Sequence, residues 1–210
     1  KAVYLEDWAR AEGRAFLRFD YSGHGESSGS FTEGCIGDWH EDTLAAVAAL
    51  TEGPLIVVGS SMGGWQALLL ARHLPERIAG LVGIAAAPDF TEDGYWANFT
   101  EAQKQTLAEV GQVELPSDYM EPYVITRRMI EDGRKRLVLR EALDLPFPVR
   151  LLQGTADTAV STATAVRLLE HAQSPDMQLT LVKDADHRFS DARCLAMIVA
   201  AINEISGREG

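Results

Sequence analysis

Apolar runs of strand length that alternate with helical patterns constrain this chain more than any other feature. We expect buried strands at 54–59, 78–87, 149–154 and 177–182. Helical composition or apolar spacing follows at 64–74, 161–172 and 190–206. Strands that alternate with helices predict a mostly parallel sheet covered by helices on both faces, because the crossover connections place the helices there. The predicted fold class is therefore α/β.

The first 50 residues add a helix, a strand and another helix to this pattern. Apolar spacing predicts a helix over 2–11, and the run AFLRFD at 15–20 predicts a short buried strand. A loop rich in glycine and serine follows. Asp38 with Glu41 three residues later is typical of a capping box, which predicts a helix from there to Leu50.

Residues 89–145 interrupt the alternation of strands and helices. They contain aromatic, acidic and helical patches but no convincing buried strand. We therefore expect one domain over 1–210, with a lid or cap insertion at 89–145. Ligands of open α/β sheets bind beyond the carboxyl ends of the strands, where such an insertion is well placed to roof a site. A purely structural helical excursion is the alternative.

The charge and the cysteine content exclude some classes of partner. With a formal net charge of −12 at pH 7 the surface repels phosphate backbones, so nucleic acid is not an expected partner. The longest mostly apolar run, 78–87, is far shorter than the roughly 20 residues that span a bilayer, so we expect no membrane span. Cys35 and Cys194 match neither a disulfide framework nor a metal-ligand spacing, so we expect no metal site.

A Gly-x-Ser-x-Gly pattern occurs twice, centred on Ser27 and on Ser61. A nucleophilic serine needs a sharp, strained turn between a strand and a helix, with small residues two positions away on either side. Only Ser61 has this context, because its strand ends at Gly59 and its helix begins by Gly64, whereas Ser27 lies in a polar loop. The helix N-terminus adds partial positive charge there, and the Met62 N–H is then one donor to an oxyanion.

The candidate base is His187. A serine nucleophile on such a turn is followed along the chain first by an acid and then by a histidine. His187 meets this order and lies in the loop DADHRFS between the last predicted strand and the last predicted helix. The other histidines either precede Ser61 or lie in helical patterns: His24, His40, His73 and His171. A structural loop histidine is the alternative interpretation of His187.

The candidate acid is Asp157, which directly follows the predicted strand at 149–154 and is thus placed to orient the base. Asp89 also follows a strand end and is the rival candidate. Asp184 and Asp186 are close to His187 in sequence only. Three positions at three strand ends, in the required order, are stronger evidence than any single motif.

The segments RFDYSGHGESSG, GSSMGGWQALLLARHLPERIAGLVGIAAA, QGTADTAV and DADHRFS together resemble the α/β-hydrolase family that contains the mitochondrial palmitoyl-protein thioesterase and acyl-glucuronide esterase. The resemblance implies that Ser61, Asp157 and His187 are the nucleophile, the acid and the base. It also implies an enzyme that acts on acyl esters or S-acylated substrates without a metal or organic cofactor. By the same resemblance the expected location is mitochondrial in a eukaryote, whereas in a bacterium we expect the cytoplasm.

The family pattern departs from this sequence at the N-terminus. Related chains carry a strand and a loop of the histidine/proline-glycine-phenylalanine type before the first helix, and that loop contributes the second oxyanion N–H. We therefore expect this chain to be truncated, with the strand and the second donor before Lys1. One missing donor costs on the order of 100- to 1000-fold in turnover.

The insertion contains the candidate substrate contacts. Its aromatic and long apolar side chains are candidates for a wall that binds an acyl chain: Trp96, Phe99, Tyr119, Met120 and Tyr123. An ordinary lid core is an equally good interpretation. Arg127 and Arg128 are candidates to hold a substrate carboxylate, although paired arginines on a helix usually face solvent or bind acids of their own chain. A catalytically silent binding protein, an acyltransferase and a perhydrolase stay open as alternative functions.

Overall fold

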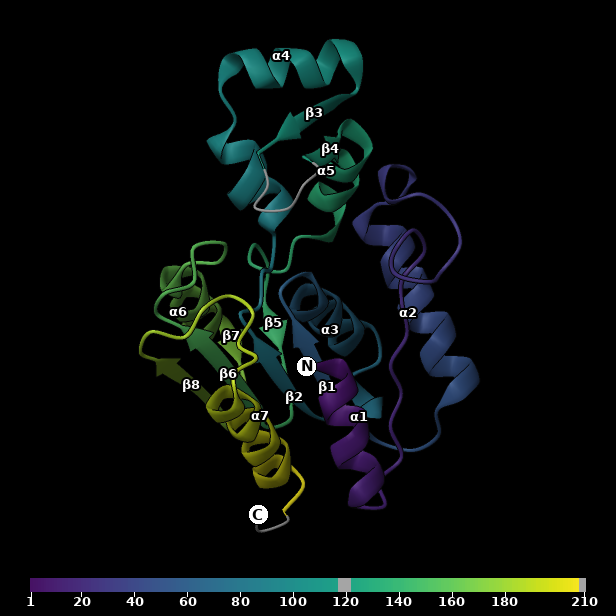
Figure 1. Ribbon diagram of the computed structural model, residues 1–210, viewed down its shortest axis with the longest axis vertical. Helices are drawn as coiled ribbons and strands as arrows, with labels where there is room; N and C mark the ends of the chain where they lie inside the picture. Colours follow the sequence, from purple (N-terminus) through teal and green to yellow (C-terminus); the bar gives the residue numbers. More distant parts are fainter. Residues whose placement is uncertain (117–121, 208–210) are drawn as a thin grey trace. The chain divides into compact units, whose positions relative to one another are not determined.

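A four-stranded sheet forms the centre of the first of two compact units in the computed structural model (Figure 1). The structure describes residues 1–116 and 122–207. The sheet has the order β1-β2-β6-β8 and consists of β1 (Leu55–Ser60), β2 (Ile78–Ile84), β6 (Val149–Gly154) and β8 (Met177–Val182). Every neighbouring pair is parallel, which confirms the predicted fold class.

The first unit comprises Lys1–Phe19, Ala46–Pro88 and the described residues from Val138 onward. Helices cover both faces of its sheet (Figure 1). On one face lie α1 (Ala2–Ala11) and α7 (Ala192–Ile205), and on the other lie α3 (Met62–His73) and α6 (Thr162–His171). The shorter elements of this unit are η2 (Pro75–Arg77) and the parallel pair β5 (Leu143–Asp144) and β7 (Ala172–Gln173).

Alternation along the strands explains the core under α1 and α7. Side chains two residues apart point to the same face of a strand, so Val82 and Ile84 of β2 both face these helices. There they meet Leu5 of α1 and Ile198 of α7, all of them buried. Full burial of such a side chain contributes about 1.5–3 kcal/mol, which keeps the strand ends fixed relative to the helices.

The second unit comprises Asp20–Ala45 and Asp89–Leu137. Its helices are η1 (Phe31–Glu33), the π-helix η3 (Phe90–Trp96), α4 (Glu101–Val110), α5 (Arg127–Gly133) and η4 (Arg134–Arg136). The helix α2 (Ile36–Leu50) begins in this unit and ends in the first. An antiparallel hairpin of β3 (Gln112–Leu115) and β4 (Tyr123–Thr126) completes it.

Three expectations from the sequence are wrong. Residues 15–20 form no strand: Phe16 and Phe19 are 39% and 37% exposed, and the segment pairs with no strand in the described part of the chain. An apolar run becomes a strand only where a neighbour accepts and donates its backbone hydrogen bonds. The insertion, in contrast, does contain strands, since Val113 and Ile125 face each other across the hairpin and are buried.

The third error concerns the start of α2. The helix begins at Ile36, so Asp38 is its third residue and does not cap it as predicted. The Asp38 carboxylate instead accepts the backbone N–H of Cys35, the residue before the helix, at 3.1 Å. In a capping box the acidic residue at the third helical position accepts the N–H of the residue before the helix. Asp38 therefore has this acidic role, and not the role of the first residue of the box that the sequence predicted.

Among the helices that the structure describes, none has both the length and the apolar character needed to cross a membrane.

Candidate active site

Ser61 occupies a strained turn between β1 and α3. Its φ of 54° lies in the left-handed region, which costs a residue with a side chain about 1–3 kcal/mol. Three backbone hydrogen bonds hold it there: its N–H donates to Ile84 O at 2.9 Å, and its carbonyl accepts from Gly64 N–H at 2.8 Å and Ala87 N–H at 3.1 Å. The adjacent strand β2 and the start of α3 therefore fix the backbone of Ser61.

Gly59 is required by the tightness of this turn. A Cβ at Gly59 would lie within 3 Å of the backbone of Gly63 and Gly64, closer than side chains approach backbone in proteins. The chain then enters α3 at Met62, whose N–H belongs to the first turn and so has no partner four residues earlier in the helix. This N–H and the helix dipole point partial positive charge toward the turn.

Ser27 has none of these features. It lies in a turn of the second unit, where its N–H donates to His24 O at 3.0 Å. Its Oγ donates to Asp20 O at 2.7 Å, so the hydroxyl closes a loop of the backbone. No strand precedes this turn and no helix follows it directly, which separates it from the turn at Ser61.

Ser61, His187 and Asp157 form one chain of hydrogen bonds within the first unit. His187 Nε2 lies 3.1 Å from Ser61 Oγ, and His187 Nδ1 lies 2.9 Å from Asp157 Oδ2. A carboxylate only accepts hydrogen bonds, so Nδ1 carries the imidazole proton and the lone pair of Nε2 faces the hydroxyl. The His187 side chain is 32% exposed, whereas that of Asp157 is 0% exposed.

Four donors surround the Asp157 carboxylate. Oδ1 accepts the backbone N–H groups of Ala159 and Val160, each at 2.8 Å. Oδ2 accepts Gln153 Nε2 at 3.0 Å and His187 Nδ1 at 2.9 Å. Burial raises the pKa of Asp157, but these hydrogen bonds, that of Val160 foremost, outweigh burial and hold the pKa below its usual value. Asp157 is therefore ionised at neutral pH.

The loops that carry Asp157 and His187 are joined directly after their strands. Thr155 N–H donates to Val182 O at 2.9 Å, and Ala156 N–H donates to Ala185 O at 3.0 Å. Asp184 N–H returns a hydrogen bond to Thr155 Oγ1 at 2.9 Å. Because β6 and β8 are neighbours in the sheet, the acid and the base are brought together by the topology and then held by these contacts.

The other candidate acids have different roles. Asp186 Oδ1 accepts Phe189 N–H at 3.0 Å and so closes the turn that carries His187. Asp184 and Phe189 bracket this turn with φ values of 62° and 48°. Asp89 is fully buried and caps the π-helix η3 with its carbonyl, which accepts from Glu92 N–H at 3.0 Å and Asp93 N–H at 2.9 Å. The carboxylate that meets His187 Nδ1 is that of Asp157.

Comparisons with known proteins agree with this architecture. A family model described as the alpha/beta hydrolase fold matches residues 5–119. The chain belongs to the α/β-hydrolase fold family. A relative, the palmitoyl-protein thioesterase ABHD10, mitochondrial, of Rattus norvegicus, is 34% identical over 207 residues, which are 98% of this chain and 69% of the relative.

Two solved structures of α/β-hydrolases extend the comparison. The first is the crystal structure of a putative hydrolase from Agrobacterium vitis S4, whose sequence is 40% identical to this chain. The two structures match with a TM-score of 0.94 over 97% of this chain and 81% of that one. Alpha/beta hydrolase domain-containing protein 10 from mouse is 33% identical with a TM-score of 0.89, over 98% of this chain and 83% of that one. The α/β-hydrolase fold of this chain thus extends well beyond the segment that the family model matches.

Those predicted substrate contacts of this α/β-hydrolase that the structure describes lie in its second unit. Trp96 is half-buried, with the Arg134 guanidinium 4.4 Å and the Lys104 ammonium 5.4 Å from its ring centre. Phe99 is buried and stacks on Tyr95 at 6.3 Å, whereas Tyr123 is exposed. Tyr119 and Met120 lie outside the described residues. A role of Trp96 and Tyr123 in substrate binding stays a prediction.

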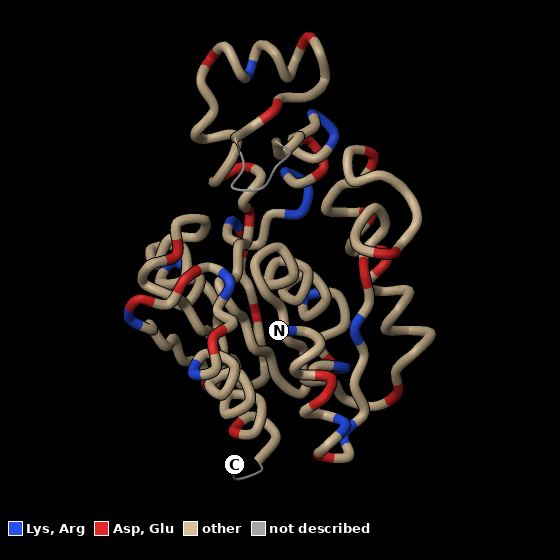
Figure 2. The backbone as a smooth tube through the Cα atoms, in the orientation of Figure 1, with Lys and Arg blue, Asp and Glu red and all other residues tan. Residues whose placement is uncertain are grey.

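Five of the ten residues 127–136 are Lys or Arg, interleaved with acidic residues (Figure 2). All four arginines of this stretch have carboxylate partners on their own chain: Arg127 with Glu131, Arg128 with Asp38, Arg134 with Glu92 and Arg136 with Asp132. Arg127 also donates to Ala108 O at 3.1 Å. A substrate carboxylate would have to compete with these partners, and the predicted role of Arg127 stays open.

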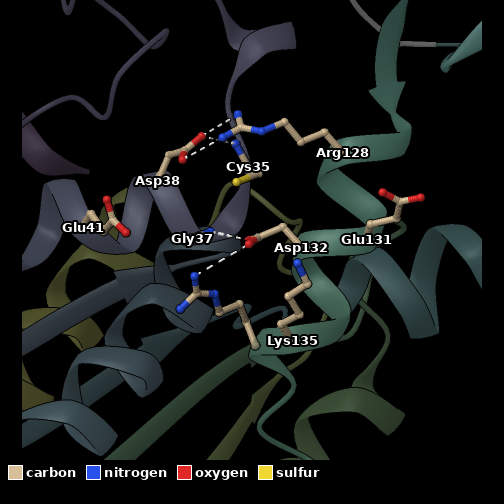
Figure 3. A pocket seen from close by; sticks show the side chains of 9 residues that line it. Cys35, Gly37, Asp38, Glu41, Arg128, Glu131, Asp132 and Lys135 are labelled. Carbon is tan, nitrogen blue, oxygen red and sulfur yellow. Dashed lines mark hydrogen bonds and ion pairs between the residues drawn. The ribbon is translucent and has the colours of Figure 1, made fainter.

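A polar cavity of about 260 Å³ lies beside these ion pairs within the second unit (Figure 3). The start of α2 and the helices α5 and η4 line it, with Arg128 bonded to Asp38 on one side and Asp132 bonded to Gly37 N–H on the other. Cys35 contributes its thiol to the wall. Burial is the main cause that raises the pKa of Cys35 to about 11, so this thiol is a poor nucleophile.

The contact of Gln153 with the candidate acid was not predicted from the sequence. Gln153 stands in the apolar strand run VRLLQG, four residues before Asp157, and it contributes one of the two donors to Asp157 Oδ2. An amide within a buried strand was the available signal, because a buried polar side chain needs a partner.

Proposed function

We propose that this α/β-hydrolase is a serine hydrolase that cleaves carboxylic ester or thioester bonds through an acyl-enzyme. Ser61 is the nucleophile, His187 the general base and acid, and Asp157 the group that orients and stabilises the imidazolium. One observation carries the proposal: the unbroken series of hydrogen bonds from Ser61 Oγ through both nitrogens of His187 to Asp157 Oδ2, at 3.1 and 2.9 Å.

The first half of the reaction forms the acyl-enzyme. His187 Nε2 takes the proton of Ser61 Oγ as Oγ attacks the substrate carbonyl carbon. The tetrahedral intermediate then collapses, and the imidazolium gives the same proton to the departing alcohol or thiol. Asp157 stays ionised throughout, since its pKa is held below the usual value.

Water completes the cycle in the second half. His187 removes a proton from a water molecule that attacks the acyl carbonyl, and the proton passes to Ser61 Oγ as the carboxylic acid leaves. The Met62 N–H at the start of α3 is one donor to the oxyanion in both halves, and the dipole of this helix adds to its effect.

The names of relatives support acyl thioesters as the substrate class. The rat, mouse and human relatives, at 32–35% identity, are each a palmitoyl-protein thioesterase. A thiolate and a p-nitrophenolate are both better leaving groups than an alkoxide, so we expect a site that accepts an acyl thioester to accept a p-nitrophenyl ester of the same acyl chain. We therefore propose S-acylated molecules with long acyl chains as substrates, and p-nitrophenyl esters as convenient probes.

Labelling with a fluorophosphonate probe tests the proposal. The wild-type protein should be labelled and should hydrolyse p-nitrophenyl esters, and Ser61→Ala should lose both properties. Ser27→Ala is the matched control, because Ser27 lies in the other Gly-x-Ser-x-Gly pattern and should keep wild-type labelling. If Ser61→Ala stays active while Ser27→Ala is inactive, the assignment is wrong. If the wild type and both variants all fail to react, the alternative of a catalytically silent binding protein is favoured.

A panel of substrates tests the finer choice between esters and thioesters. Acyl-CoA and S-acyl peptides, compared with unactivated alkyl esters of equal chain length, should give the higher kcat/KM for the thioesters. A preference for short-chain oxygen esters would exclude the long-chain thioester while keeping the serine mechanism.

A further inference from the structure

Gln153 is the buried side chain that ties the acid loop together. It lies on β6 and is 1% exposed. Its amide nitrogen, Nε2, is within hydrogen-bond distance of three acceptors: Asp157 Oδ2 at 3.0 Å, Val160 O at 3.0 Å and Gly154 O at 3.2 Å. These acceptors belong to the start, the middle and the end of the loop 154–160, so a single amide group closes the loop around the carboxylate.

The surroundings of Gln153 determine which way its amide faces. All three groups near Nε2 are oxygen acceptors, so an amide turned by 180° would place its own oxygen against two carbonyls and a carboxylate. The opposite atom, Oε1, is buried and has no hydrogen-bond partner among the described residues. A buried acceptor without a partner costs about 1–3 kcal/mol. In this orientation the amide leaves Oε1 without a partner among the described residues and directs its N–H groups at the loop 154–160.

The contact with Asp157 has a direct consequence for the base. Gln153 Nε2 and His187 Nδ1 donate to the same carboxylate oxygen, at 3.0 and 2.9 Å. Oδ1 is meanwhile held by two backbone N–H groups. Without Gln153, Oδ2 would keep only the imidazole as a donor, so the carboxylate would be held less firmly against rotation about its Cβ–Cγ bond.

We propose that Gln153 is a positioning residue for the hydrolytic reaction: it fixes the Asp157 carboxylate so that Oδ2 orients the Nδ1–H of His187. The inference rests on the proposed function. It goes beyond that function because it assigns a role in turnover to a side chain that touches neither the substrate nor the reacting atoms. A purely structural role predicts lower stability alone, whereas a positioning role also predicts a lower kcat at an unchanged KM.

The test compares two variants of Gln153 with a control that contacts the segment before the same strand. Gln153→Met keeps the length of the side chain and removes the donor. Gln153→Glu keeps the shape and replaces the donor by a carboxyl group. The control is Ser174→Ala, because Ser174 Oγ donates to Phe147 O at 2.9 Å near the opposite, amino end of β6. For each protein we would measure kcat, KM, the melting temperature and the NMR signal of the His187 Nδ1–H proton.

Gln153→Met should lower kcat by about ten- to hundredfold, the effect of losing a buried hydrogen bond to a charged group, and should leave KM within about twofold. The Nδ1–H signal should shift or broaden. Ser174→Ala should leave kcat and this signal unchanged, whatever its melting temperature. A folded Gln153→Met with wild-type kcat and an unchanged signal overturns the inference.

Gln153→Glu gives a second, independent readout that does not depend on the stability of Gln153→Met. Two carboxyl groups within 3 Å cannot both ionise easily, so one takes up a proton as the pH falls and again donates to Asp157 Oδ2. Activity relative to the wild type should therefore rise between about pH 8 and about pH 6. A constant ratio over this range overturns the inference.

The failure of this inference differs from the failure of the proposed function. An inactive Ser61→Ala together with a fully active Gln153→Met overturns the role of Gln153 alone. An active Ser61→Ala overturns the serine mechanism, and the positioning role falls with it.

Discussion

Asp184 donates its backbone N–H to the Thr155 hydroxyl at 2.9 Å, and this contact links the loop that carries the acid to the loop that carries the base. Unlike the neighbouring backbone contacts of Thr155 and Ala156, this link depends on a side chain, and it is separate from the contact of His187 with Asp157. A conservative substitution can therefore remove it without changing the fold.

Thr155→Val should weaken both stability and turnover. The variant keeps the shape of the side chain but leaves the Asp184 N–H without its acceptor, which costs about 0.5–1.5 kcal/mol in the free energy of unfolding. We expect kcat to fall several-fold, since His187 lies three residues after Asp184. Urea unfolding and steady-state kinetics measure the two effects. Thr155→Ser keeps the hydroxyl and should match the wild type, so an equal loss in both variants would contradict this role.

Gly154→Ala tests how closely the same two loops must approach. An added Cβ would overlap the carbonyl group of Ala185, the acceptor of the Ala156 N–H. Overpacking of this kind costs about 1–3 kcal/mol, and it would push the His187 loop away from Asp157. The melting temperature and kcat should both fall. Gly53→Ala is a control in open space, although its φ of 68° adds some strain, and it should lower stability without the loss of kcat.

Asp157→Asn should lower kcat by about three to four orders of magnitude while the protein stays folded. An amide in place of the carboxylate can present its N–H₂ group to His187 Nδ1, which favours the tautomer that protonates Nε2 and blocks its use as a base. A kcat within tenfold of the wild type would contradict the assignment of Asp157 and would favour Asp89.

The same variant gives a prediction about pH. The pKa of Asp157 is lower in the folded protein than its usual value, so its ionised form stabilises the fold above the unfolded-state pKa of about 3.9. This stabilisation is lost as the pH falls through the lower, folded-state pKa. Wild type and Asp157→Asn should therefore differ in free energy of unfolding at pH 7 and converge below about pH 4. A difference that is the same at both pH values would show that Asp157 makes no net electrostatic contribution.

Cys35 should resist alkylation in the folded protein. It is 3% exposed, and burial raises the pKa of its thiol to about 11, so about one thiol in a thousand is ionised at pH 8. Iodoacetamide should modify it rapidly only after denaturation, as mass spectrometry of its peptide would show. Rapid modification of Cys35 in the native protein would contradict the described packing of the cavity.

The strands of the four-stranded sheet were predictable from the sequence, and each of them pairs with at least one neighbour. β6 and β8 begin and end as predicted: β6 is buried between β2 and β8, and β8 pairs with β6 at the end of the described strand order. Residues 15–20 have the same kind of composition but pair with no described strand, and composition alone does not report whether a partner exists. For the β3–β4 hairpin the prediction was wrong in the opposite sense, because no buried strand was expected there. Strands of four residues are too short to show the alternation of apolar and polar residues.

The three residues of the candidate triad were predictable from the sequence, whereas the side chains that hold them in place were not. Chain order and strand ends were enough to select Ser61 and His187, but Asp157 and Asp89 both follow strand ends and only the hydrogen bond to His187 Nδ1 separates them. The contacts of Gln153 and Thr155 depend on where β6 and β8 place their loops. No local pattern in the sequence reports such distances between separate loops.

The central claim is tested most directly by locating the acyl group on the enzyme. Rapid quenching during turnover of a p-nitrophenyl ester, followed by digestion and mass spectrometry, should find the acyl mass on the peptide that contains Ser61 and on no other. The adduct should be absent in Ser61→Ala and should accumulate in variants that slow its hydrolysis. An acyl group on Ser27 or Cys35, or full turnover in Ser61→Ala, would contradict the account.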